Sequence, residues 1–107
     1  MQPFWVYVLR CNDGSYYTGH TDNLEVRVAQ HVAGTIISCH TYSRRPVALV
    51  FSQDFPTREE ALAAERQIKG WSRKKKEAMI RGDWPEVSRL AHASSSIAKP
   101  GAREDRD

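Results

Sequence analysis

Residues 4–9, Phe-Trp-Val-Tyr-Val-Leu, form an unbroken run of aromatic, β-branched and aliphatic side chains. Such a run is typical of a strand covered on both faces, so it predicts the middle strand of a sheet. Asn12-Asp13-Gly14 supplies a turn and residues 15–19 a second short strand, which together predict a β-hairpin. If the hairpin loop holds an odd number of residues, Tyr7 and Tyr17 project from the same face, whereas an even number separates them.

The residues after the hairpin predict a first helix that ends at Gly34. Asp22 and Glu25 stand at the spacing of a capping box, which marks the start of the helix. Apolar side chains then recur at helical spacing, at Leu24, Val28 and Val32. Arg27 and His31 lie four residues apart beside this stripe, so they can share one target.

The middle of the chain predicts a loop, a third strand and a second helix. Residues 35–46 are polar and basic, and residues 47–52 predict the strand that completes a small sheet. Thr57 and Glu60 stand in capping-box register, and Gly70 is placed to end the helix. The expected inward side of this helix holds Ala61, Leu62, Ala64, Glu65 and Ile68. A carboxylate inside an apolar stripe is costly unless it has a partner or a function.

The last third of the chain predicts a third helix and little beyond it. Ser72 can cap a helix that runs to Gly82. We expect residues 1–82 to form one domain and residues 83–90 a short helical extension. Residues 91–107 lack an apolar face to bury, so we expect them to form a flexible tail.

Composition indicates a soluble globular protein, with 40% hydrophobic and 27% charged residues. No apolar stretch is long enough to span a bilayer or to form the core of a signal peptide, so we expect no membrane partner. Cys11 and Cys39 lack the spacing of a zinc site or a disulfide framework. Cys39 and His40 are two potential ligands without others at metal-site spacing, which is weak evidence for zinc. A cytoplasmic location suits this composition.

The net charge of +3 arises in residues 1–80, because residues 81–107 carry equal numbers of basic and acidic side chains. Basic patches attract polyanions without reading sequence. A solvated helix face explains such patches equally well. The candidate nucleic-acid-binding residues are Arg44, Arg45, Lys69, Arg73, Lys74, Lys75 and Lys76.

Several side chains have the chemistry that phosphodiester cleavage requires. Arg27 can hold a non-bridging oxygen, and Glu65 is the kind of hard ligand that binds a largely hydrated Mg²⁺. Four further side chains can position water or move protons: Tyr7, Tyr17, His20 and His31. Each residue also has an ordinary structural explanation: strand packing for the tyrosines, a surface ion pair for Arg27, hydrogen bonding for His31 and a nearby cation for Glu65.

Taken together, these pieces resemble the GIY-YIG nuclease superfamily, and most closely its small single-domain bacterial members of the UPF0213 type, over about residues 4–80. The ordered segments that carry the resemblance are Val6-Tyr7-Val8, Tyr17-Thr18-Gly19, residues 24–31 with Arg27 and His31, Arg44-Arg45-Pro46-Val47, and residues 61–69 with Glu65. This sequence departs from its relatives at several positions. Some relatives carry Lys at the position of His20, and several have a late Asn for which we can place no counterpart in residues 71–76. The segment 38–42 also differs from the Lys/Arg-rich version of the small members.

The resemblance implies an α/β domain of the α+β type, in which about three helices flank a three-stranded antiparallel sheet, and a hydrolytic site with one divalent ion. Glu65 would coordinate Mg²⁺ or Mn²⁺, and Arg27 would bind the scissile phosphate. Tyr17 would orient or deprotonate the attacking water, assisted by Tyr7 and His31. A phenol has an ordinary pKa of about 10. Deprotonation near neutrality therefore needs the metal, Arg27 or a nearby base such as His20.

The expected function is metal-dependent endonuclease action on DNA, in repair or processing. The DNA can be single-stranded, double-stranded or branched, and RNA is an open alternative. A second hypothesis is a nucleic-acid-binding module of the same fold that is weakly active or inactive. A third is a domain that recruits a protein partner, and it predicts no salt-dependent affinity for DNA.

Overall fold

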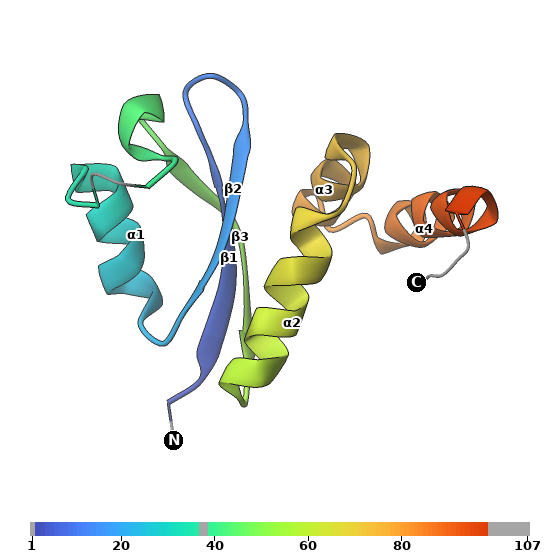
Figure 1. The fold of residues 1–107 in the computed structure, drawn as a ribbon, viewed down its shortest axis with the longest axis horizontal. Helices are drawn as coiled ribbons and strands as arrows, with labels where there is room; N and C mark the ends of the chain where they lie inside the picture. Colours follow the sequence, from blue (N-terminus) through green and yellow to red (C-terminus); the bar gives the residue numbers. More distant parts are fainter. Residues whose placement is uncertain (1, 37–38, 99–107) are drawn as a thin grey trace. The chain divides into compact units, whose positions relative to one another are not determined.

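The computed structural model describes residues 2–36 and 39–98, which fall into two compact units that meet in sequence between Gly70 and Trp71. The first unit contains β1 (Phe4–Arg10), β2 (Tyr16–Thr21), α1 (Leu24–Ala33), the short 3-10 helix η1 (Tyr42–Arg44), β3 (Ala48–Phe55) and α2 (Arg58–Lys69) (Figure 1). The second unit contains α3 (Arg73–Ile80) and α4 (Trp84–Ala98). The grouping of residues 1–82 as one domain stays a prediction.

The three strands form one antiparallel sheet in the order β2-β1-β3, as predicted. Strand β1 lies between the other two strands, and the side chains of Val6 to Leu9 are buried on both of its faces. Strand β3 extends to Phe55, three residues beyond the predicted end. Phe55 pairs with Phe4 at the start of β1, so the pairing partner sets the length of β3.

The hairpin register places Tyr7 and Tyr17 on one face of the sheet. Residues 11–15 form the loop, an odd number, and Leu9 stands opposite Tyr17 while Tyr7 stands opposite Gly19. The ring centroids of the two tyrosines are 6.3 Å apart. The conditional prediction of a shared face is therefore confirmed.

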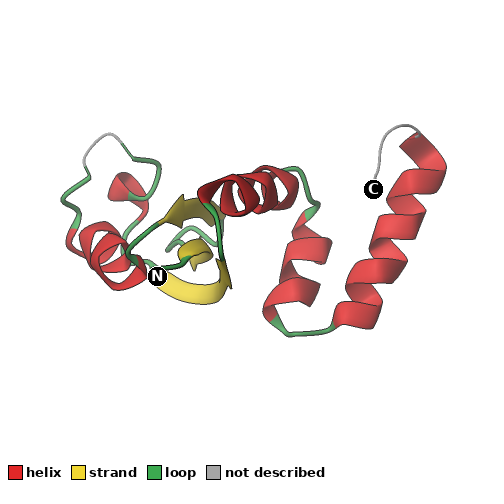
Figure 2. Ribbon diagram, turned by 90° about the horizontal axis from the view of Figure 1, so that it is seen from below, coloured by secondary structure: helices red, strands yellow, loops and turns green. Residues whose placement is uncertain are grey.

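Helices α1 and α2 cover opposite faces of the sheet (Figure 2). On the α1 face, Leu24 and Val28 pack against a core that includes Tyr7 and Leu9. The predicted place of Val32 in this stripe is wrong, since Val32 is 53% exposed. His31 is buried instead, because a residue seven positions after Leu24 returns to the same side of a helix.

The start of α1 also differs from the expectation. Its N-cap is Asn23, not Asp22, and the Asn23 side chain accepts a hydrogen bond from the backbone N–H of Val26. Both residue types are good caps, so the sequence alone did not separate them. Gly34 ends the helix as predicted, with a positive φ of 76°.

Helix α2 has the predicted ends and the predicted buried face. The Thr57 side chain accepts from the N–H of Glu60, and the Gly70 N–H donates to carbonyls of the last turn. Ala61, Glu65 and Ile68 are buried, and the helix contacts all three strands. The carboxylate of Glu65 is thus held on the inward side, facing the sheet.

In the second unit, α3 begins after the predicted cap Ser72 and ends before Gly82. Helix α4 runs from Trp84 to Ala98, so residues 91–98 are helical where we expected a tail. Alanine has the highest helix propensity, and extending a helix costs less than starting one, so the helix begun at Trp84 continues past residue 90. Residues 99–107 of the expected tail lie outside the described residues.

Within the described ranges, no helix is long and apolar enough to cross a membrane.

Candidate active site

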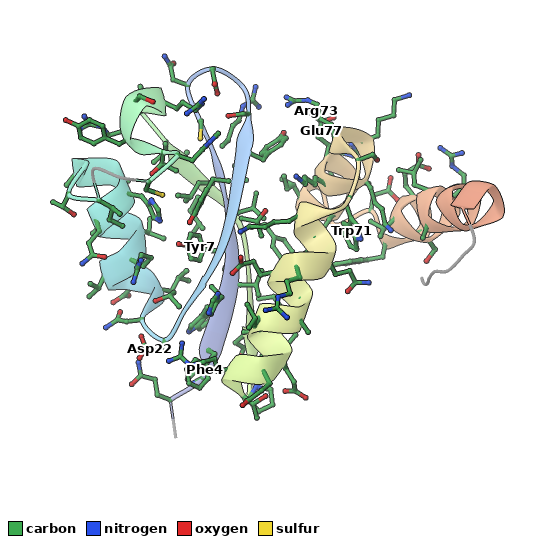
Figure 3. The ribbon with its side chains drawn as sticks, viewed as in Figure 1. Phe4, Tyr7, Asp22, Trp71, Arg73 and Glu77 are labelled. Carbon is green, nitrogen blue, oxygen red and sulfur yellow. The ribbon has the colours of Figure 1, made fainter. Side chains whose placement is uncertain are left out.

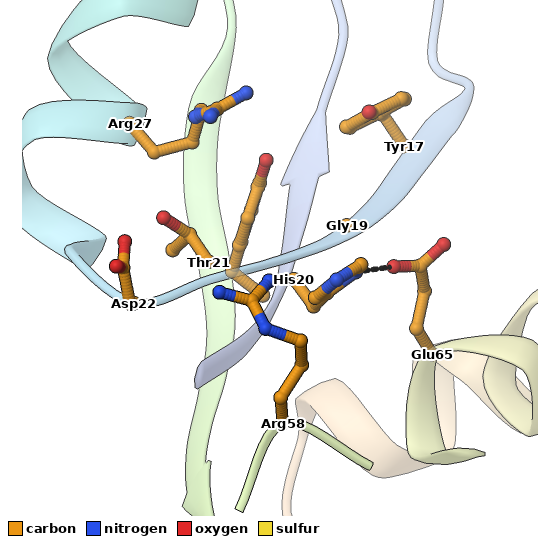
Figure 4. Close-up of a pocket in the computed structure, with 9 residues that line it drawn as sticks. Tyr17, Gly19, His20, Thr21, Asp22, Arg27, Arg58 and Glu65 are labelled. Atoms are coloured by element: carbon orange, nitrogen blue, oxygen red, sulfur yellow. Dashed lines mark hydrogen bonds and ion pairs between the residues drawn. The ribbon is translucent and has the colours of Figure 1, made fainter. Parts of the chain in front are cut away.

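A cavity of about 460 Å³ lies at strand β2, which is an edge strand of the sheet (Figure 4). Side chains from both faces meet there, because Tyr7 and Tyr17 lie on the α1 face while His20, which pairs with Val6, belongs to the strand's other side. The lining residues are Tyr7, Tyr17, Gly19, His20, Thr21, Asp22, Arg27, Arg58 and Glu65. The fold therefore brings the candidate catalytic and metal-binding residues other than His31 to one cavity, whereas none of the candidate nucleic-acid-binding residues lines it.

Gly19 makes room for the two tyrosines. A Cβ atom at Gly19 would lie 2.6 Å from the Tyr7 hydroxyl oxygen and 3.1 Å from a ring carbon of Tyr17. No larger residue fits without displacing Tyr7, since real Cβ contacts are longer than this. The glycine of the second motif is therefore a steric requirement of the site.

His31 holds the Tyr7 hydroxyl from behind the cavity. Its Nε2 lies 2.9 Å from the Tyr7 hydroxyl oxygen, and its Nδ1 lies 2.7 Å from Thr41 Oγ1. All three side chains are buried. Burial and the nearby charge of Arg27 lower the pKa of His31, which favours the neutral ring. A neutral imidazole has one donor and one acceptor nitrogen, so it can satisfy both hydroxyls at once.

Tyr17 is a neutral phenol in this environment. Burial, followed by its hydrogen bond to Cys39, raises the pKa of Tyr17 to about 12. Burial also raises the pKa of Tyr7, with a smaller contribution from Tyr17. The His40 ring is stacked on the Tyr17 ring, with centroids 6.2 Å apart. Because both pKa values are raised, the two phenols keep their protons near neutral pH and do not act as bases there.

Glu65 is 8% exposed, and both of its carboxylate oxygens have a nitrogen partner. Oε1 lies 2.5 Å from His20 Nδ1, and Oε2 lies 2.7 Å from Lys69 Nζ. Burial alone would raise the pKa of Glu65, but the hydrogen bonds from Lys69 and His20 lower it below its ordinary value. The carboxyl group is consequently ionised near neutral pH.

These contacts give His20 and Lys69 a partner that the sequence analysis did not predict, the carboxylate of Glu65. His20 was expected to act on Tyr17, yet its hydrogen bond is to Glu65. Lys69 was expected on a nucleic-acid surface, yet its ammonium group is paired with Glu65. Both differences arise because Glu65 faces the edge strand from α2, one helical turn before Lys69.

The donor set of the cavity fits a hydrated divalent ion. Within the described residues there is no group of three or more His, Cys, Asp or Glu side chains that could enclose a metal. Mg²⁺ does not need such an enclosure, because it keeps several waters and binds proteins through one or two carboxylates. Glu65 is a buried, ionised carboxylate in a polar cavity, and Asp22 also lines that cavity.

Four of the remaining basic candidates, Arg44, Arg45, Arg73 and Lys75, have partners within the chain. Arg44 pairs with Asp13 at 3.0 Å, and Arg45 donates to the carbonyl of Tyr42. In α3, Arg73 pairs with Glu77, and the Lys75 ammonium lies 4.2 Å from the centre of the Trp71 ring (Figure 3). Contact between nucleic acid and the residues Arg44, Arg45, Lys69, Arg73, Lys74, Lys75 and Lys76 stays a prediction.

Several residues of the site were not identified from the sequence as site residues, among them Arg58, Thr41, Thr21 and Asp22. Arg58 lines the cavity from the first residue of α2. A basic residue at a helix N-terminus opposes the helix dipole, and this signal could have singled it out. Thr41 bonds to His31 from the segment after α1, and no local pattern indicates that contact.

Comparisons with known proteins identify the family of this chain. Residues 3–78 match the family described as the GIY-YIG catalytic domain. A UPF0213 protein of Staphylococcus haemolyticus is 44% identical over 80 residues, which cover 75% of this chain and 96% of that protein. A UPF0213 protein of Listeria welshimeri is 47% identical over 75 residues, covering 69% and 81% of the two chains. The solution NMR structure of a protein from E. faecalis has 30% identity, covers 97% of each chain and gives a TM-score of 0.51.

Proposed function

Because this chain belongs to the GIY-YIG family, we propose that it is an endonuclease that hydrolyses DNA phosphodiester bonds with one bound Mg²⁺ or Mn²⁺. The observation that carries the proposal is the position of Glu65, an ionised carboxylate that lines the same cavity as Tyr17 and Arg27. A metal ligand, a hydroxyl donor and a phosphate-binding cation are the groups that such hydrolysis requires.

Each side chain has a role in the proposed reaction. A divalent ion held by Glu65 would polarise the phosphoryl oxygens as a Lewis acid. The guanidinium of Arg27 holds a non-bridging oxygen of the scissile phosphate, and it has no acidic partner in the described part of the chain. The neutral Tyr17 phenol orients the attacking water, and Tyr7, fixed by His31, assists from the same face.

His20 and Lys69 act on Glu65 rather than on the substrate. Their hydrogen bonds orient the carboxylate and keep it ionised, which prepares it for a cation. These two contacts must loosen when a cation binds to Glu65, because together they engage both oxygens of the carboxylate. The positive charge of Lys69 makes it a competitor of the metal as well as a support of its ligand.

DNA is the proposed substrate, with a place in repair or processing, because the chain has a net positive charge and two arginines, Arg27 and Arg58, line the cavity. A second candidate is a DNA-binding module that does not cleave. The engagement of both Glu65 oxygens by His20 and Lys69 favours it, because this pairing opposes metal binding.

Cleavage assays test the proposal directly. Labelled single-stranded, double-stranded and branched DNA are incubated with the protein in Mg²⁺, in Mn²⁺ or in EDTA. We expect cleavage only with a divalent ion, and a loss of about a hundredfold or more for Glu65→Gln and Arg27→Ala with DNA binding largely retained. Glu59→Gln is the matched control, since Glu59 is an exposed carboxylate on the same helix. Cleavage in EDTA, or cleavage unchanged by Glu65→Gln, contradicts the proposal, whereas metal-independent DNA binding without cleavage supports the second candidate.

A further inference from the structure

Two guanidinium groups line the cavity from different helices, Arg27 from α1 and Arg58 from α2 (Figure 4). Within the described residues, neither makes an ion pair with an acidic side chain. Other arginines of the chain do have carboxylate partners: Arg44, Arg73, Arg81 and Arg89. An arginine without a carboxylate partner in a polar cavity is suited to a phosphate, which its planar fork can bind through two hydrogen bonds.

The surroundings of Arg58 fix its position and add to its attraction for anions. The carbon at the centre of its guanidinium lies 4.8 Å from the centre of the Phe4 ring, which supports the group from β1. Arg58 is also the first residue of α2, where the helix dipole is positive. A cation there opposes the dipole, but together they form a strong local site for a negatively charged group.

Arg58 and Glu65 lie seven residues apart on α2, which places them two turns apart on one side of the helix. Their backbone positions are therefore separated by about 10 Å along the helix axis. Phosphates of one DNA strand follow at about 3.4 Å of axial rise per nucleotide, so this separation corresponds to about three nucleotides. A strand whose scissile phosphate lies near Glu65 and Arg27 can therefore place a second phosphate, a few nucleotides away at most, within reach of Arg58.

We propose that Arg58 binds a second DNA phosphate, within about three nucleotides of the scissile one on the same strand, and so sets the register of the strand in the site. The assignment rests on the proposed function, because it takes DNA as the ligand. It adds a second phosphate contact to the cavity and gives Arg58 a positioning role in substrate binding.

Binding measurements test this assignment without cleavage. Fluorescence anisotropy of a labelled 20-base-pair duplex in EDTA gives the affinity of the Glu65→Gln protein across a range of salt concentrations. Adding Arg58→Ala should reduce the slope of log K against log salt by about 0.9, the value of one lost phosphate contact. Arg66→Ala is the control, since Arg66 is exposed on the same helix and does not line the cavity. An unchanged slope and affinity for Arg58→Ala overturns the assignment.

Cleavage of modified duplexes locates the phosphate. Duplexes with one neutral methylphosphonate at successive positions around the cut are compared for the native protein and Arg58→Ala. We expect one position within about three nucleotides of the scissile phosphate where the modification lowers kcat/KM for the native protein but has no further effect on Arg58→Ala. Additive losses at every position overturn the assignment. A native protein that cleaves no DNA refutes the proposed function instead, and the salt slope then still decides whether Arg58 contacts a phosphate.

Discussion

Gly19 stands directly opposite Tyr7 in the hairpin, and a Cβ atom at Gly19 would lie 2.6 Å from the Tyr7 hydroxyl oxygen. We therefore expect Gly19→Ala to push the Tyr7 ring out of the site. The cost in unfolding free energy should be about 1–3 kcal/mol, the usual range for overpacking a core. Cleavage should fall more than stability explains, because the displaced hydroxyl also loses His31.

Urea unfolding and kcat measured on the same preparation check this prediction. Gly70→Ala is the matched control, since a Cβ there meets only ordinary contacts at 3.6 Å and beyond, and Gly70 has a right-handed backbone conformation. A Gly19→Ala protein that is as active as the Gly70→Ala protein contradicts the steric argument.

Thr41 supports Tyr7 through His31, so its hydroxyl should matter for both stability and rate. Thr41→Val keeps the shape but leaves His31 Nδ1 with the Cys39 sulfur, 3.9 Å away, as a weak partner in place of the hydroxyl, at a cost of about 1–3 kcal/mol. Thr41→Ser keeps the hydroxyl and should stay close to the native protein in the pH dependence of kcat. Equal behaviour of the two variants would show that the hydrogen bond has no role.

Lys69 competes with the metal for Glu65, so Lys69→Met should strengthen Mn²⁺ binding. Lys69 is 52% exposed and its pair with Glu65 is partly screened, so the gain should be modest. An exposed ion pair contributes about 1 kcal/mol at most, which corresponds to roughly fivefold in affinity.

Titration calorimetry with Mn²⁺ measures this directly, and Lys74→Met serves as the control for a change of net charge. Weaker Mn²⁺ binding by Lys69→Met than by Lys74→Met is the opposite of the expected result. It would mean that Lys69 orients the carboxylate more than it competes for it.

The Tyr17 phenol should lose its proton only at high pH, because burial and its hydrogen bond to Cys39 raise its pKa to about 12. The folded-state pKa lies above the ordinary value of about 10, so the unfolded chain loses its proton first as pH rises. Stability should therefore be constant with respect to this group below pH 10, and decline between about pH 10 and 12.

Urea unfolding at pH 9, 10 and 11, together with phenolate absorbance at 295 nm, tests the order of these steps. Tyr17→Phe should lose one late-titrating phenol and show a shallower decline in stability. Tyr16→Phe is a control on the same strand. If Tyr17→Phe and the native protein decline identically, the pKa of Tyr17 is not raised by folding.

Local patterns predicted the elements well where the signal lies in neighbouring residues. The apolar run of residues 4–9 indicated the central strand, and Thr57 with Gly70 bounded α2. The errors came where a local pattern had two solutions. Asn23 and Asp22 are both good caps, and Val32 lies just beside the buried side of α1 that His31 occupies.

By itself, the sequence determined the order of strands and helices and the spacing of Tyr7, Tyr17, Arg27 and Glu65, because caps, turns and periodicity act between neighbours. Only the tertiary structure decided which partners these groups have. Helix α2 packs against the edge strand β2, so Glu65 contacts His20 although the two residues are far apart in the sequence. The same packing brings Arg58 to the cavity. Contacts of this kind depend on packing between elements, which no local pattern encodes.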